Sequence, residues 1–200
     1  MPFVFKRLAL LVSIAAALAA DKDAEFKPAP AASYPHQTNE KITIGADPYM
    51  AGDKVKTAFG KLDPYDYGIL PVLVVIQNDG DKSIRLTRMK VEYVSPGSGH
   101  VAATPASEVR YLRGPSRPNV ITGGPPGTGK IGRGKKNPLD EWEIQGRAFS
   151  AEMLPPGNTA SGFFYFQTGL QSGATLYVSG LAEAAGGREL FYFEVPLKPR

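Results

Sequence analysis

The sequence predicts an all-β fold, a single antiparallel β-sandwich with at most short helical turns. Two runs carry the prediction, an apolar one at residues 69–76 and an aromatic one at residues 162–167. A third observation is the content of turn-forming residues, since the 200 residues include 22 glycines and 18 prolines. Many short strands joined by such turns are typical of sandwiches and barrels. A chain of this length is long enough for one domain with a substantial core.

The first twenty residues have the pattern of a secretory signal peptide. Lys6 and Arg7 precede an apolar stretch at residues 8–19, and small residues follow it. The stretch is about a dozen residues long, whereas a membrane-spanning helix needs roughly twenty, which argues against an uncleaved anchor. We expect cleavage after Ala19 or Ala20, export to the periplasm or the outside of the cell, and no transmembrane segment in the mature chain.

Residues 21–40 are rich in alanine and proline and show no apolar period, so we expect a flexible tether there. The sandwich domain is then expected at residues 41–197. Ile42 and Ile44 alternate with polar residues and predict a short strand at its start. Residues 54–59 are interpreted as a second short strand.

Residues 69–76 are apolar on both faces of a ribbon and rich in β-branched side chains, which predicts a central strand covered on both sides. A tight hairpin turn is expected at residues 78–81, followed by an amphipathic strand that pairs with the first. The apolar phase of that strand slips by one residue at Thr87–Arg88. A β-bulge is the simplest repair of such a slip.

The later elements are shorter. We expect a weak strand at residues 101–104, a turn of helix from Pro105 towards Leu112, and either a helical turn or a strand at residues 139–145. The aromatic run at 162–167 predicts a further strand. Two more at residues 174–181 and 189–195 form a closing hairpin around Gly186–Gly187, with Leu176 and Val178 facing Phe191 and Phe193 across the core.

Residues 113–138 show no periodicity and predict a long irregular loop rich in glycine and proline. Seven basic residues and no acidic one occur between positions 110 and 136: Arg110, Arg113, Arg117, Lys130, Arg133, Lys135 and Lys136. Without Lys6 and Arg7 the mature chain has 21 basic and 19 acidic residues, a net charge of +2. Since these seven residues carry +7, the rest of the mature chain has a net charge of −5, and the positive charge is concentrated in this loop. Such a loop is either a solvated segment or a site for an anionic surface polymer or lipid head groups. Only Tyr111 lies nearby to stack on bases, so no specific nucleic-acid binding is expected.

Residues 124–130, Gly-Pro-Pro-Gly-Thr-Gly-Lys, resemble the phosphate-binding loop of AAA-type ATPases. That loop needs a hydroxyl for magnesium after its lysine and a helix behind it. Here Ile131 stands at the hydroxyl position, and the next residues are poor helix formers. A chance match in a glycine-rich loop is the better interpretation, and nucleotide binding is the weaker alternative.

No complete catalytic or metal-binding set is present in the sequence. Cysteine is absent and there are two histidines, His36 and His100, too few for a histidine-built zinc site. No serine has the Gly-x-Ser-x-Gly context of a hydrolase nucleophile. Asp140, Glu141 and Glu143 adjoin Trp142, but adjacent acids on a loop edge more often face solvent. We therefore expect no enzyme activity and no cofactor.

Two stretches resemble uncharacterised secreted bacterial proteins built on an immunoglobulin-like sandwich. They are the strand Pro-Val-Leu-Val-Val-Ile-Gln-Asn at residues 71–78 and Leu-Pro-Pro-Gly at 154–157 before the aromatic strand. The resemblance implies an exported immunoglobulin-like module and supplies no site residues, because a shared sandwich does not transfer function. Together with the missing catalytic set, it favours a non-catalytic binding or structural module whose partner is an unknown protein or an anionic surface polymer.

Overall fold

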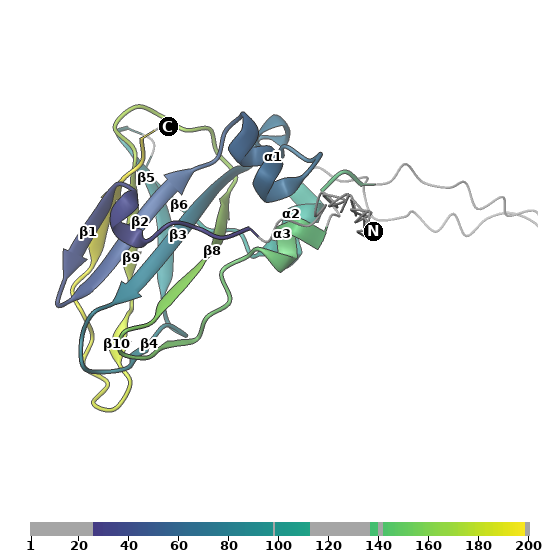
Figure 1. Cartoon of the computed structure of the whole chain (residues 1–200). Helices are drawn as coiled ribbons and strands as arrows, with labels where there is room; N and C mark the ends of the chain where they lie inside the picture. Colours follow the sequence, from purple (N-terminus) through teal and green to yellow (C-terminus); the bar gives the residue numbers. More distant parts are fainter. Residues whose placement is uncertain (1–25, 98, 113–136, 140–141, 199–200) are drawn as a thin grey trace, which may run out of the picture.

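The computed structural model describes residues 26–97, 99–112, 137–139 and 142–198. Within these residues the predicted all-β fold is confirmed, because three antiparallel sheets form most of the regular structure and the helices are short. Figure 1 shows the two larger sheets packed face to face, with the α-helices of the described residues gathered at one end. No helix in the described part of the chain is long and apolar enough to cross a membrane.

The first large sheet has the strand order β1-β2-β3-β8. Its strands are β1 (His36–Asn39), β2 (Ile42–Pro48), β3 (Leu70–Asn78) and β8 (Thr159–Phe166). β3 is hydrogen-bonded to β2 along one edge and to β8 along the other. The predicted central strand is therefore confirmed, and so is the aromatic strand, which pairs with it.

The second large sheet has the order β11-β9-β5-β6, and a small sheet has the order β10-β4-β7. The strands are β11 (Phe193–Pro196), β9 (Thr175–Ser179), β5 (Lys90–Ser95), β6 (Gly99–Ala102), β10 (Ala182–Glu183), β4 (Ile84–Arg85) and β7 (Met153–Leu154). The closing pair is confirmed, with Phe193 opposite Val178. Placing Phe191 in the core was wrong, because its side chain is 72% exposed and Leu190 is buried instead.

The two faces of β3 pack into two different cores. Leu70, Val72 and other even-numbered residues face the second sheet, where they meet Tyr93, Leu176 and Phe193. Leu73 and Val75 face the other way and pack with side chains of the helices and of β8. This division explains why the run is apolar at every position: a strand buried on both faces has no solvent-facing side.

In the described part of the chain, three α-helices and two 3-10 turns cover the outer face of the first sheet. They are α1 (Asp53–Phe59), α2 (Ala106–Leu112), α3 (Trp142–Gly146), η1 (Ala31–Ser33) and η2 (Pro64–Tyr67). α2 confirms the expected helix, and α3 decides between the two alternatives at residues 139–145. The strand expected at residues 54–59 was wrong. Val55, Ala58 and Phe59 are buried at the three- and four-residue spacing of one helix face.

The turn after β3 does not make a hairpin. Both edges of β3 are already paired, so the chain leaves its sheet at Asn78 and enters the small sheet as β4. The β-bulge at Thr87–Arg88 is also corrected: these residues form a turn, with the amide of Met89 donating to the carbonyl of Leu86 at 2.9 Å. The slip in apolar phase thus marks a change of sheet between β4 and β5.

The segment that was expected to be a tether belongs to the fold from residue 26 onward. Ala31 is fully buried, β1 pairs with β2, and the side-chain amide of Asn39 donates to the carbonyl of Tyr192 at 3.0 Å. The tether prediction is therefore corrected for residues 26–40. Residues 21–25, like the proposed signal peptide, lie outside the described residues.

Candidate functional site

Most of the predicted basic loop lies outside the described residues. This applies to Arg113, Arg117, Lys130, Arg133, Lys135, Lys136 and the segment 124–130 that resembles a phosphate-binding loop. Arg110 is described: it lies on α2 with its guanidinium 4.8 Å from the centre of the Tyr111 ring. Its carbonyl accepts a hydrogen bond from the side-chain amide of Asn137 at 2.6 Å. The two ends of the loop are thus tied together beside the helices.

The two histidines lie in separate parts of the molecule. The Nδ1 atom of His36 is 2.7 Å from the carbonyl oxygen of Tyr34, and that of His100 is 3.2 Å from a carboxylate oxygen of Glu92 on the second sheet. Within the described ranges no three histidine, cysteine, aspartate or glutamate side chains gather closely enough to hold a metal ion.

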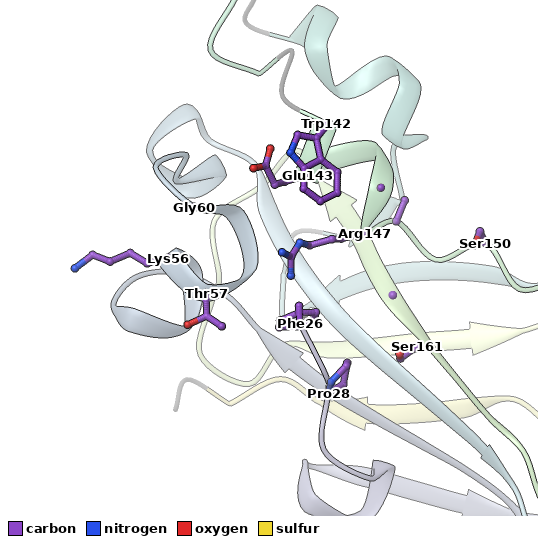
Figure 2. Close-up of a pocket in the computed structure, with 13 residues that line it drawn as sticks. Phe26, Pro28, Lys56, Thr57, Gly60, Trp142, Glu143, Arg147, Ser150 and Ser161 are labelled. Atoms are coloured by element: carbon purple, nitrogen blue, oxygen red, sulfur yellow. The ribbon is translucent and has the colours of Figure 1, made fainter. Parts of the chain in front are cut away.

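A pocket of about 980 Å³ opens between α1, α3, the segment at Phe26 and β8 (Figure 2). The residues that line it are Phe26, Pro28, Lys56, Thr57, Gly60, Trp142, Glu143, Gly146, Arg147, Ala148, Ser150, Ser161 and Gly162. They come from four separate segments of the chain. The lining combines charged, aromatic and hydroxyl side chains. The pocket was not predicted from the sequence.

Two glycines let the elements around the pocket pack closely against one another. A Cβ on Gly162 would lie 2.4 Å from the Cα of Phe149, so the strand β8 and the segment after α3 approach too closely for any side chain there. A Cβ on Gly146 would lie 2.7 Å from the ring of Trp142. The indole therefore rests on the last turn of α3, and 66% of its surface is exposed.

Arg147 is the most unusual residue of the pocket. Its guanidinium carbon lies 4.9 Å from the centre of the Phe26 ring and 5.9 Å from the centre of the Trp142 ring. Its Nε and Nη1 atoms are shielded from solvent and have no hydrogen-bond partner among the described residues. The backbone is fixed, because the carbonyl of Arg147 accepts a hydrogen bond from the amide of Phe163 at 2.9 Å. The aromatic rings hold the cation but do not neutralise it.

Glu143 carries a second charge of this kind. Its Oε2 atom is shielded from solvent and, like the two arginine nitrogens, has no partner in the described part of the chain. Its Oε1 atom would lie 3.7 Å from a Cβ on Gly60 of the neighbouring helix end. The expectation that this carboxylate faces solvent is wrong for one of its oxygens. Asp140 and Glu141 lie outside the described residues.

Two buried tyrosines lie close enough to Arg147 to respond to its charge. Burial raises the pKa of Tyr49 and of Tyr165 well above the usual value, and the guanidinium of Arg147 opposes the rise in both. The Tyr165 hydroxyl donates to the carbonyl of Ile144 on α3 at 2.7 Å. Both phenols therefore stay neutral, and Tyr165 fixes α3 on the sheet without supplying a counter-charge.

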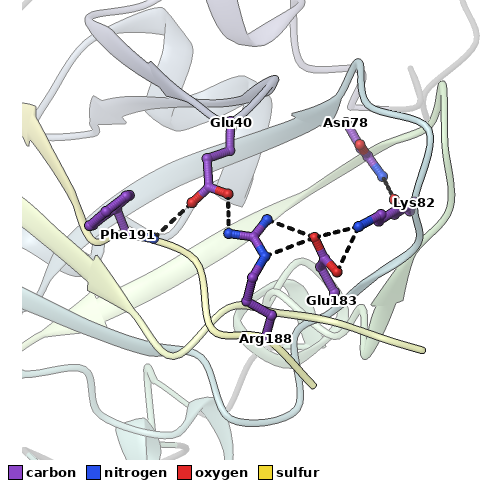
Figure 3. A network of polar contacts seen from close by, with 6 residues as sticks. All are labelled: Glu40, Asn78, Lys82, Glu183, Arg188 and Phe191. Carbon is purple, nitrogen blue, oxygen red and sulfur yellow. Dashed lines mark hydrogen bonds and ion pairs between the residues drawn. The ribbon is translucent and has the colours of Figure 1, made fainter. Parts of the chain in front are cut away.

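A second charged cluster lies at the opposite end of β3 and is fully paired (Figure 3). Glu183 is 8% exposed, and its carboxylate accepts from Arg188 at 2.6 Å and from Lys82 at 3.0 Å. These hydrogen bonds hold the pKa of Glu183 below its usual value. Arg188 also pairs with Glu40. Because every charge in this cluster has a partner, it joins strands and leaves no charge for a ligand.

No family model matches the chain, and no curated protein matches it. Among solved structures it is similar to one described as a functionally unknown protein from Listeria monocytogenes EGD-e, with a TM-score of 0.33 and 12% identity over 82% of each chain. A likeness at this level carries no argument about function. The immunoglobulin-like assignment stays a prediction.

Proposed function

We propose that the protein is an exported, non-catalytic binding module that holds an anion-bearing ligand in the pocket at Arg147. The observation that carries the proposal is the guanidinium of Arg147, which lies between two aromatic rings, is partly shielded from solvent and has no counter-charge among the described residues. A buried charge that lacks a partner is costly to the fold. A carboxylate or phosphate in the pocket supplies the missing partner, and the partial shielding of the guanidinium from water strengthens that pairing.

The composition of the pocket supports binding rather than catalysis. Ser150 and Ser161 line it, yet His36 and His100 both lie outside it, so neither serine has a histidine base there. Pockets built for ligands combine apolar or aromatic walls with a few placed polar groups, as this one does. Export is supported by the charged start, the apolar stretch and the small residues of positions 1–20.

The test is an anion titration of the purified chain, with the unfolding temperature Tm as readout at constant ionic strength. Citrate and inorganic phosphate are compared with chloride, because a ligand that binds the native state raises Tm with concentration. We expect the rise in the wild-type chain and its loss in Arg147→Gln. The matched control is Arg88→Gln, which removes an exposed arginine of the β4–β5 turn and should respond as the wild type does.

Two results would overturn the proposal. One is a Tm that no anion raises above its value in chloride. The other is a rise that Arg147→Gln retains in full, which would move anion binding to the basic segment at residues 110–136.

A further inference from the structure

The pocket holds a second unpaired charge that an anion alone does not satisfy. Glu143 and Arg147 are four residues apart, and the amide of Arg147 donates to the carbonyl of Glu143 at 3.2 Å, so the helical turn continues between them. Opposite charges at this spacing usually meet across one turn. Here they form no ion pair in the described structure, although both have shielded atoms without a partner.

The two side chains are held apart by their neighbours. In Figure 2 the guanidinium of Arg147 points towards Phe26, while the carboxylate of Glu143 points towards Gly60 and α1. The rings of Phe26 and Trp142 keep the guanidinium in its position. The pocket therefore presents a positive and a negative group at two separate places on the same wall.

From this arrangement we infer that the ligand is a zwitterion, an amino acid or a short peptide, with its carboxylate at Arg147 and its ammonium group at Glu143. The inference rests on the proposed function and names its ligand class. A purely anionic ligand would neutralise Arg147 but would be repelled by Glu143, and a purely cationic one would meet the reverse. A molecule with both charges a few ångströms apart satisfies both side chains, and neither charge is left unpaired.

The rest of the lining fits such a ligand. The exposed face of Trp142 and the ring of Phe26 offer an apolar surface to a side chain, and the hydroxyls of Ser150 and Ser161 are available to polar backbone groups.

The experiment measures Kd by calorimetry for four related probes. L-phenylalanine and glycyl-L-phenylalanine carry both charges, N-acetyl-L-phenylalanine carries the carboxylate alone, and L-phenylalanine amide carries the ammonium group alone. We expect the zwitterions to bind at least about 10-fold more tightly than either single-charge probe, because each of those probes lacks one of the two hydrogen bonds between charged groups. A tighter amino acid points to a free amino acid as ligand, and a tighter dipeptide points to a peptide.

Variants separate this inference from the proposed function. Glu143→Gln should weaken both zwitterions about 10-fold or more and leave N-acetyl-L-phenylalanine bound at least as tightly as before, because the repulsion by the carboxylate is gone. Glu108→Gln, which changes an exposed acid on α2, should alter the binding of none of these probes. The inference fails if the zwitterions do not bind, if N-acetyl-L-phenylalanine binds as tightly as they do, or if Glu143→Gln binds them as the wild type does. In each of these cases the proposed function is still supported if Arg147→Gln loses the rise in Tm with citrate or phosphate. If Arg147→Gln keeps that rise, the proposed function and the inference both fail.

Discussion

The side chain of Asn78 fixes the point at which the chain passes from the first large sheet to the small one. It is 1% exposed and makes three hydrogen bonds. Its amide donates to the carbonyls of Lys82 at 2.8 Å and Leu154 at 3.0 Å, and its oxygen accepts from the amide of Gly80 at 2.9 Å. No other side chain of the same size offers two donors and an acceptor in this geometry.

We expect Asn78→Ala to lower the free energy of unfolding by about 3 kcal/mol. The carbonyl of Leu154 is left buried without this partner, which costs about 1–3 kcal/mol, whereas the two bonds to the turn are replaced by water at about 0.5–1 kcal/mol each. The assay is urea unfolding followed by circular dichroism. The matched control, Gln77→Ala, removes an exposed bond to Asp79 and should cost less than about 0.5 kcal/mol.

Asn78→Asp provides a second check on the same reasoning. It keeps the oxygen that Gly80 needs but faces two carbonyl oxygens with a carboxylate, so we expect the folded-state pKa of the new group to be raised. A raised pKa means that stability is retained at acidic pH and lost as the pH rises. The deficit relative to wild type should therefore be larger near neutral pH than near pH ~4. Two results would refute this account. One is a decrease of less than about 1 kcal/mol in the free energy of unfolding of Asn78→Ala, and the other is a stability difference between Asn78→Asp and wild type that does not change with pH.

Two further predictions concern a glycine and a buried carboxylate. Gly45→Ala should lower Tm markedly, because its Cβ would lie 2.3 Å from the carbonyl oxygen of Ala31, and an unchanged melting curve would show that η1 is not held against β2. The pairing of Glu183 with Arg188 and Lys82 lowers the pKa of Glu183, so its contribution to stability is present at neutral pH and is lost as the pH falls through the folded pKa. The difference in urea midpoint between wild type and Glu183→Gln should therefore close in acid, and a difference that is constant with pH would contradict the pairing.

The parts of the fold that could be predicted are those set by local pattern. β3 was recognisable because β-branched and apolar residues occupy both of its faces, and β8 because aromatic residues cluster between turns. The strands that pair with β3 could not be predicted from the sequence. A turn at residues 78–81 predicts a hairpin only when an edge of the preceding strand is free, and the partners β2 and β8 lie far away in the sequence.

The sequence of α1 contains a helical pattern, but it was interpreted with the two-residue period of a strand. Lysine and valine alternate at the start of residues 54–59, which suggests a strand, whereas Val55, Ala58 and Phe59 follow the helical spacing.

The pocket had no comparable signal in the sequence. Arg147 and Glu143 look like ordinary surface charges until Phe26, more than a hundred residues earlier, is placed against the guanidinium. Four separate segments form the pocket, so its recognition requires the fold itself. The basic segment at residues 110–136 is the reverse case. Its charge is evident from the sequence, but six of its seven basic residues lie outside the described structure.

The packing of β3 on both faces affects how the protein unfolds in part. The residues on one face belong to the sandwich. Those on the other face pack against the helical layer, in which α3 carries Glu143 and is followed directly by Arg147. The helical layer is the smaller of the two packed units, so its detachment is the cheaper partial unfolding event and leaves the sandwich intact. A ligand that bridges α3 and the segment at Phe26 acts against that detachment. Occupancy of the pocket would then appear as slower amide exchange in the helices, with the exchange rates of β5 and β9 unchanged.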